Sequence, residues 1–457
     1  MNSTKQQKKI LIIIISSFFI KGCGDSNLIN DNSEQIRQPP VPTNSLYTNF
    51  QWEKSTPSDE GMDEILLDEA FSFGLQDGTF TQAAVVVRNE KIVFEDYRNI
   101  GPAEIQILQE NDWSEQLWSN FEFRDSQSLS SSWSVAKSFV SILIGIAIDR
   151  GFIESIESPA SDFLFEWQSD ERNLIKIKDL LNMRSGLVPV CRDVSSTEPV
   201  VCTTYPGSGG DILPFTNITE VCLNRQIAEV GIIQPWFSDT LTWEENYFLY
   251  INCDTQVLGE LLERAVGNDL ETFAEVNLFS KIGFDNYWWR DASENFTAYC
   301  CLDATPRDFA KLGQLMLNYG AWGNEQIVSR EYIETIKRIY PDYIVTERGG
   351  NWSYGMKFWT LDFPRIQSDG VEFPTYPIYY AAGYDGQFIV VDYEKNLVIV
   401  RNSLYFPLLG NDERIIKLTG DLYEEVAFPL TLPNTLGIPI YFNSEEFVYK
   451  IHKSIYQ

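Results

Sequence analysis

The chain has 457 residues, 44% of them hydrophobic and 14% aromatic, which is more than one small globular core requires. Its 65 acidic residues outnumber 35 Lys and Arg, and the formal net charge is −30. This balance excludes a protein that binds nucleic acid through Lys and Arg contacts to phosphate. It also disfavours long-range attraction of an anionic substrate. We expect a charged, soluble surface on one large domain with an inserted subdomain, or on two domains.

The N-terminus has the pattern of a targeting segment. Three lysines among the first nine residues precede an apolar run, Ile10–Ile20, which is shorter than a comfortable bilayer span. The following Gly-Cys pair resembles a bacterial lipoprotein signal. The sequence therefore predicts a signal peptide over residues 1–22, a lipid anchor on Cys23 and a flexible tether over residues 23–50. An ordinary secretory signal or an uncleaved anchor is the alternative, and either places the body in the cell envelope or outside the cell.

Cysteine usage agrees with export. The remaining six cysteines are Cys191, Cys202, Cys222, Cys253, Cys300 and Cys301. An even number is compatible with disulfides, although the sequence does not choose among the possible pairings. We expect the adjacent pair, Cys300 and Cys301, not to join each other, because the resulting ring is strained. No Cys-x-x-Cys or Cys–His spacing predicts a zinc site.

The body begins with a helix and a hairpin. Residues 62–71 carry apolar side chains at helical spacing, and residues 83–98 form two strand-like runs around a turn at Asn89-Glu90. Residues 134–150 are apolar on nearly every side, which predicts a buried helix that ends at Gly151.

The second half of the chain passes from helices to strands. Residues from about 153 to 340 have mostly helical spacing, three strand-like runs follow Trp352, and residues 412–427 are expected to form a last helix. Strands at both ends with helices between them predict an α/β fold with an antiparallel sheet, flanking helices and an inserted all-helical subdomain at about 153–340. The domain is placed at 51–430 and a C-terminal extension at 431–457.

A serine and a lysine mark the mouth of the buried helix. Ser134 stands three residues before Lys137, so both lie on one helical face. The only histidine, His452, is five residues from the C-terminus, where we expect disorder or a surface position. No G-x-S-x-G elbow is present, so a Ser-His-Asp triad is excluded.

Lysine can replace histidine as the base. Burial in the helix disfavours the charged ammonium, and the neutral amine of Lys137 can take the hydroxyl proton of Ser134. The free N–H groups at the helix start favour the oxyanion that attack creates. The alternative is structural: Ser134 caps a core helix and Lys137 extends to solvent from its end.

Two later segments supply the other parts of an acyl-transfer site. Tyr250 and Asn252 lie between the nucleophile and the late strands, beside a predicted helix. A strand flanked by glycines then ends in the sequence Gly383, Tyr384, Asp385, Gly386 and Gln387. The glycines let another backbone approach closely, and a backbone N–H here can face the serine. Each element by itself also has a structural interpretation, as a packed aromatic residue or a bulge.

The order of these motifs resembles the serine β-lactamase and penicillin-binding-protein superfamily. Within it the chain is most similar to class C-like esterases and 6-aminohexanoate-dimer hydrolases, over roughly residues 57–427, including the segments at 179–187 and 302–315. The resemblance implies that Ser134 is acylated and that Lys137 is its base. It further implies that Tyr250 relays the proton to the leaving group, and that Asn252 orients the lysine or the substrate. The N–H groups of Ser134 and Gln387 would form the oxyanion hole.

The third motif departs from the family. The resemblance implies Lys or His followed by Thr-Gly, whereas this chain has Tyr384-Asp385-Gly386. The cation that would hold a substrate carboxylate is missing, and Asp385 adds a repelling charge. We therefore predict an exported serine hydrolase of small neutral esters or amides that needs no metal or cofactor. The alternatives are a β-lactamase or D-amino-acid peptidase, and a catalytically inactive protein that binds cell-wall peptide or a partner protein.

Overall fold

The computed structural model describes residues 50–110, 115–187, 190–192, 199–201, 212, 215–227, 248–338, 352–366, 372–404 and 442–456. All of them belong to one compact unit, Asn44–Gln457. Within these ranges no helix combines the length and apolar character needed to cross a membrane. The predicted signal peptide, Cys23 and the predicted helix at 412–427 lie outside the described residues.

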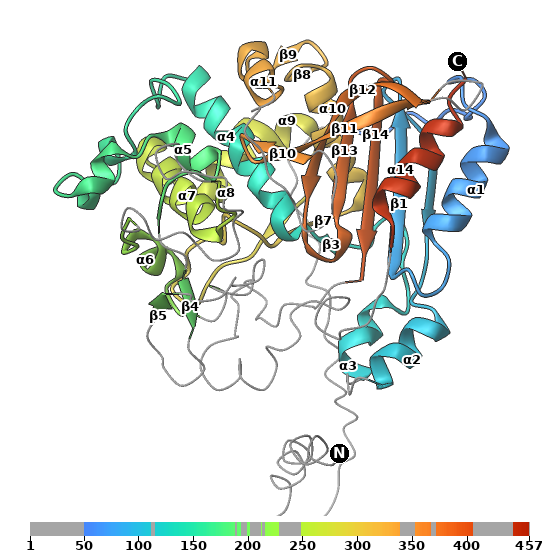
Figure 1. Cartoon of the computed structure of the whole chain (residues 1–457), viewed down its shortest axis with the longest axis horizontal. Helices are drawn as coiled ribbons and strands as arrows, with labels where there is room; N and C mark the ends of the chain where they lie inside the picture. Colours follow the sequence, from blue (N-terminus) through green and yellow to red (C-terminus); the bar gives the residue numbers. More distant parts are fainter. Residues whose placement is uncertain are drawn as a thin grey trace, which may run out of the picture. The chain divides into compact units, whose positions relative to one another are not determined.

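A seven-stranded antiparallel sheet forms the centre of the unit, in the order β10-β11-β12-β13-β14-β1-β2 (Figure 1). The strands are β1 (Thr81–Arg88), β2 (Lys91–Tyr97), β10 (Trp352–Gly355), β11 (Phe358–Ile366), β12 (Glu372–Ala382), β13 (Phe388–Asp392) and β14 (Leu397–Ser403). The first and last parts of the chain meet where β1 pairs with β14, with Val85 opposite Val400. This confirms the predicted sheet. The β1–β2 turn lies at Asn89 and Glu90, whose φ values of 52° and 67° are those of a two-residue hairpin turn.

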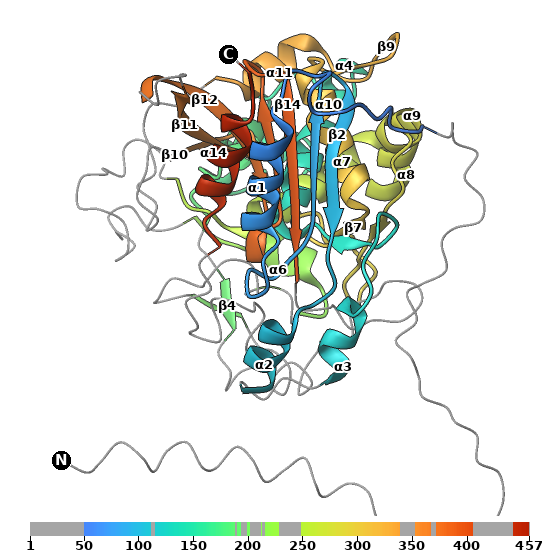
Figure 2. The same ribbon diagram turned by 90° about the vertical axis from the view of Figure 1, so that its right-hand side faces the viewer.

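Two helices from opposite ends of the chain cover one face of the sheet. Figure 2 shows α1 (Glu64–Gly74) beside α14 (Ser444–Lys453). A Cβ on Gly74 would lie 2.4 Å from the ring of Phe447, so the close approach requires a glycine there. The residues expected to form a C-terminal extension thus include a helix that packs in the domain core.

His452 is buried, although its place near the C-terminus suggested disorder or a surface position. It is 4% exposed, and Nε2 lies 2.7 Å from Asp392 Oδ2 while Nδ1 lies 2.8 Å from the Val448 carbonyl oxygen. Tyr376 also donates to Asp392, at 2.6 Å. The helix carries the histidine onto the sheet, where it is a structural residue instead of a surface one. Its exclusion as a catalytic base stands, because its hydrogen bonds hold α14 on β13.

Helices cover the other face. α10 (Pro306–Leu317) packs on β1, β13 and β14, and α4 (Ala136–Asp149) lies between the sheet and α7 (Asn252–Val266) (Figure 1). The other helices are α2 (Pro102–Glu110), α3 (Glu115–Trp118), α5 (Ile177–Leu181), α6 (Ile218–Leu223), α8 (Leu270–Ala274), α9 (Ser280–Ile282) and α11 (Arg330–Ile336). Nearly every side chain of α4 is buried, as its apolar sequence predicts.

The inserted region is not all helical. It contains two short hairpins, β4 (Val190–Arg192) with β5 (Pro199–Val201) and β8 (Ala321–Trp322) with β9 (Glu325–Gln326). A small sheet joins β3 (Ser130–Ser131), β7 (Leu302–Ala304) and β6 (Tyr287–Trp288). These strands are only two or three residues long, too short for period-two alternation to reveal them.

Two disulfides are present among the described residues. Cys222–Cys253 joins α6 to α7, and Cys300 is bonded to Cys301. The prediction that the adjacent cysteines do not pair is wrong. The backbone reverses at this point, with Cys301 at a φ of 68°, and both side chains are buried in the same turn. The side chain of Cys191, in β4, and the whole of Cys202 lie outside the described residues.

Candidate active site

The nucleophile candidate lies on a strained turn. Ser134 is the middle residue of the 3₁₀ turn Trp133–Val135, directly before α4. Trp133 has a φ of 44°, an unfavourable value for a bulky side chain that requires support from its surroundings. That support comes from Ser132, whose N–H donates to the Leu302 carbonyl and whose Oγ accepts from the Leu302 N–H, both at 2.9 Å. The small β3–β7 sheet therefore holds Ser134 in place.

Lys137 meets Ser134 as their spacing predicts. Lys137 is 1% exposed, and its Nζ lies 2.8 Å from Ser134 Oγ and 2.8 Å from the Tyr299 carbonyl oxygen. A neutral amine has two N–H donors and one lone pair. Donation to Tyr299 orients the amine so that its lone pair can face the serine hydroxyl. The pair can therefore transfer a proton from the hydroxyl to the amine.

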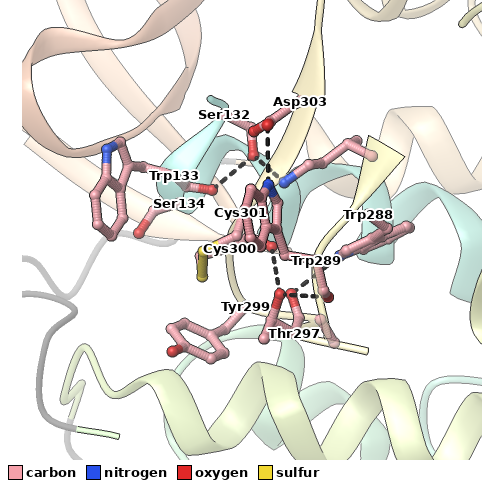
Figure 3. The surroundings of a disulfide bond; sticks show 12 residues. Ser132, Trp133, Ser134, Trp288, Trp289, Thr297, Tyr299, Cys300, Cys301 and Asp303 are labelled. Atoms are coloured by element: carbon pink, nitrogen blue, oxygen red, sulfur yellow. Dashed lines mark hydrogen bonds between the residues drawn. A yellow bond between two sulfur atoms is a disulfide. The ribbon is translucent and has the colours of Figure 1, made fainter. Parts of the chain in front are cut away.

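The acceptor of Lys137 belongs to a firmly held turn. Figure 3 shows Tyr299, Cys300 and Cys301 beside the segment that carries Ser134. One end of this turn accepts the bond from Lys137, and the other end pairs with Ser132 through Leu302. The Cys300–Cys301 disulfide lies between the two attachments and restricts the backbone there.

Tyr250 comes to the same place from the segment before α7. The Lys137 Nζ lies 5.1 Å from the centroid of the Tyr250 ring. That ring stacks on Trp359, at 5.6 Å and 25°, and meets Tyr354 edge to face, at 5.6 Å and 82°. Asn252 begins α7 and is buried. Tyr250 is thus adjacent to Lys137 in the fold, as its order in the sequence predicts, and Asn252 follows two residues later at the buried start of α7.

The late motif approaches Ser134 through Gly383. A Cβ on this residue would lie 2.3 Å from the Ser132 carbonyl oxygen and 3.2 Å from the Ser134 nitrogen. Only a glycine lets the end of β12 come so close to the nucleophile. The ring of Tyr384, the next residue, lies 6.4 Å from that of Trp133.

The Gln387 N–H, predicted to face Ser134, has a hydrogen-bond acceptor within its own turn. This N–H donates to the Tyr384 carbonyl oxygen at 3.4 Å, and the side-chain amide of Gln387 donates to the Ser403 carbonyl oxygen at 2.9 Å. The turn at Tyr384–Gly386, with Asp385 at a φ of 59°, carries Gln387 back into the sheet. Gly383, which directly precedes Tyr384, is the residue of this segment that lies against Ser134.

Arg401 supports the Tyr384–Gly386 turn, and no pattern in the sequence indicated this role. The buried guanidinium donates to the Gly386 carbonyl at 2.8 Å, to the Thr79 carbonyl at 2.9 Å and to Thr81 Oγ1 at 2.9 Å. Burial lowers the pKa of Arg401 to about 9, although the carboxylates of Glu104 and Asp385 oppose this. Because the charge of Asp385 interacts with Arg401, its repulsion of an anionic substrate is weaker than the sequence suggests.

The described residues contain no group of three or more His, Cys, Asp or Glu side chains arranged to hold a metal ion. The assembled groups are instead a serine, an amine, a phenol and backbone amides. Such a set can carry out acyl transfer through a covalent intermediate.

Comparison with known proteins places this arrangement in a family. A family model described as Beta-lactamase matches residues 81–418. No curated protein sequence matches the chain significantly. The fold is similar to that of a Bacillus anthracis protein assigned as a 6-aminohexanoate-dimer hydrolase, with 18% identity, a TM-score of 0.54 and coverage of 88% of this chain and 92% of that one.

Two further solved structures share the fold. A protein from Bacteroides dorei DSM 17855 assigned as a beta-lactamase has 15% identity and a TM-score of 0.55, over 87% of this chain and 100% of that one. EstCE1, a hydrolase with promiscuous acyltransferase activity, has 13% identity and a TM-score of 0.50, over 86% of this chain and 98% of that one. At these identities the likeness shows the fold alone. The family model spans most of the chain and includes the Ser134–Lys137 dyad and Tyr250, and the chain belongs to the beta-lactamase family.

Proposed function

We propose that the protein is a serine hydrolase that cleaves small neutral esters or amides through an acyl-enzyme on Ser134. The observation that carries this proposal is the contact of 2.8 Å between Lys137 Nζ and Ser134 Oγ, in a site where the amine is buried. Burial favours the neutral amine that a general base requires.

The chemistry follows from the positions of these groups. Lys137 takes the hydroxyl proton as Ser134 Oγ attacks the substrate carbonyl carbon. The N–H groups of Ser134 and Tyr384 donate to the oxyanion of the tetrahedral intermediate. Tyr250 relays this proton from Lys137 to the leaving alcohol or amine, so both side chains return to their starting protonation, and the acyl group stays on Ser134. Water then attacks the ester, and the acid product leaves as Ser134 regains its proton.

The preference for neutral substrates rests on the strand end beside the nucleophile. Residues 381–387, Ala-Ala-Gly-Tyr-Asp-Gly-Gln, contain no Lys, Arg or His. A carboxylate on a β-lactam or a peptide C-terminus would find no charge-assisted hydrogen bond from this segment, a contribution worth about 1.5–3 kcal/mol. A short-chain ester has no carboxylate and loses nothing by this.

The experiment compares substrates and a covalent probe on one purified protein. A fluorophosphonate should label the wild-type protein and leave Ser134→Ala unlabelled. Hydrolysis of p-nitrophenyl butyrate, a linear 6-aminohexanoate dimer and a chromogenic cephalosporin then ranks the substrate classes. Equal labelling of Ser134→Ala would refute the acyl-enzyme. A cephalosporin hydrolysed faster than the ester would show that the protein is a β-lactamase, and the absence of labelling would favour an inactive binding protein.

The proposal also includes export and a lipid anchor. It is supported by the lysines and apolar run of the N-terminus and by the Cys222–Cys253 disulfide, which suits an oxidising compartment. Expression in a bacterium with labelled palmitate should mark the wild-type protein and not Cys23→Ala. Labelling that survives this substitution would place any lipid elsewhere.

A further inference from the structure

Two ionisable side chains are buried close to the cluster of side chains on which Tyr250 packs, and they form no ion pair with each other. Asp254, on the first turn of α7, is 0% exposed, and Lys357, in the β10–β11 turn, is 2% exposed. Asp254 Oδ1 accepts from Ser185 Oγ at 2.6 Å, and its Oδ2 has no hydrogen-bond partner among the residues that the structure describes. The Lys357 ammonium contacts Met183 Sδ at 3.2 Å. Burying a carboxylate and an ammonium in this way is costly, and such groups are retained mostly where they serve function.

Lys357 occupies an unusual place for a lysine. It lies at the tip of a two-residue hairpin turn, with φ values of 51° at Met356 and 65° at Lys357, a position normally exposed to water. Here the tip enters the body of the protein. Its N–H donates to the Leu181 carbonyl at 3.0 Å, and its own carbonyl accepts from Ser138 Oγ at 2.7 Å. Ser138 directly follows Lys137, so the turn is attached to the helix that carries the base.

An aromatic wall connects this pair to the active site. Met183, Phe248 and Tyr354 form a buried cluster against which Tyr250 and Trp359 pack. Tyr354 lies between the two regions, because its ring meets that of Tyr250 at 5.6 Å. Burial raises the pKa of Tyr354, and the charges of Tyr250 and Asp254 raise it further. Met183, Phe248 and Tyr354 are all buried, and charge is poorly screened among buried side chains.

Asp254 and Lys357 each oppose the pKa shift that burial imposes on the other. Burial raises the pKa of Asp254 to about 7, while Lys357 lowers it and Asp179, on α5, raises it. Burial lowers the pKa of Lys357 to about 7, against the attraction of Asp254. Asp179, on α5, therefore acts on Asp254, and Asp254 acts in turn on Tyr354 together with Tyr250. Lys137 Nζ, on α4, lies 5.1 Å from the centroid of the Tyr250 ring.

We propose that Asp254 and Lys357 are positioning residues whose opposite charges set the electrostatic potential at Lys137 and Tyr250, and so the pH above which Ser134 is activated. This inference rests on the proposed function. A positive charge at Lys357 favours loss of a proton from the catalytic amine. A negative charge at Asp254 favours retention of that proton by the amine. The two substitutions that remove these charges therefore act in opposite directions.

The test is the pH dependence of Ser134 labelling by a fluorophosphonate, with Lys357→Met and Asp254→Asn. The labelling rate rises with pH as the base loses its proton. We expect Lys357→Met to raise the midpoint and Asp254→Asn to lower it, each by at least about half a pH unit. The double variant should have a midpoint between those of the single variants. Met183→Leu is the matched control, because it alters the contact with Lys357 and removes no charge, and its midpoint should equal that of the wild type.

The outcomes separate this inference from the proposed function. Labelling of Ser134 with equal midpoints in wild type and both single variants would overturn the inference and leave the function intact. Midpoints that move in the same direction would also overturn it, because a merely structural disturbance has no charge-dependent sign. Labelling of Ser134→Ala would overturn the proposed function itself. Lys357→Gln and Asp254→Ser repeat the comparison if one of the first variants does not fold.

Discussion

The close approach of Gly383 to the nucleophile leads to a sharp prediction for Gly383→Ala. The φ of −120° and ψ of 169° at this residue are open to alanine, so the substitution causes no backbone strain of its own. The added methyl group would lie 2.3 Å from the Ser132 carbonyl oxygen, more than about 1 Å inside normal contact. Neither side can retreat freely. Gly383 donates to the Gln387 carbonyl at 2.7 Å, and Ser132 is paired with Leu302.

The strand end and the serine turn must therefore separate by about 1 Å, and such a displacement in an active site costs about 100-fold in rate. This is about 2.7 kcal/mol of transition-state stabilisation. We expect kcat for p-nitrophenyl butyrate to fall by about that factor while KM changes little, because the loss is one of oxyanion donors. Initial rates on the purified variant measure both constants.

Gly267→Ala is the matched control. Gly267 ends α7 at a φ of 69°, and within the described part of the chain no atom lies within 4 Å of an added Cβ. Alanine in this conformation should lower the free energy of unfolding by about 1 kcal/mol and leave kcat unchanged. A Gly383→Ala enzyme with kcat within threefold or so of the wild type would refute the close approach as a catalytic requirement, since a real displacement costs about 100-fold.

Three other variants test the supports of the site and the fold. Arg401→Met removes the guanidinium that holds the Gly386 carbonyl, and kcat should fall about tenfold. The free energy of unfolding should fall by at least the equivalent energy, about 1.4 kcal/mol, because a buried acceptor loses its donor. An unchanged kcat would show that the turn keeps its conformation without Arg401. His452→Gln should lower the free energy of unfolding in urea at neutral pH by about 1.5–3 kcal/mol. Burial raises the pKa of Asp392, but the hydrogen bonds from His452 and Tyr376 outweigh burial and hold this pKa below its usual value. The stabilisation by the ionised Asp392 is therefore present above about pH 4 and is lost as the pH falls through the lowered pKa of the folded protein. A variant that shows the same loss of stability in acid as the wild type would contradict that role. Replacing both Cys300 and Cys301 by serine should lower kcat about tenfold, because the turn that orients Lys137 becomes less restricted. A kcat equal to that of the wild type would contradict this role of the disulfide.

Local patterns in the sequence determined much of the fold. The Asn89-Glu90 turn, the mostly apolar α4 and the late strands were predictable because each is decided by neighbours within a few residues. The meeting of Ser134 and Lys137 was predictable for the same reason, since three residues on a helix place two side chains on one face. Motif order then indicated that Tyr250 and the Gly383 segment complete the site.

Contacts between distant segments decided the rest. The way in which the Gly383–Gln387 segment approaches Ser134 depends on a turn of three residues and on a strand some 250 residues away, which no local spacing encodes. His452 is buried because α14 returns to the sheet, and Lys357 is buried because a hairpin tip enters the space between α4 and α5. The amino-acid types at these positions favour the surface. Only the packing of the complete chain supplies the partners that make burial of their charges tolerable.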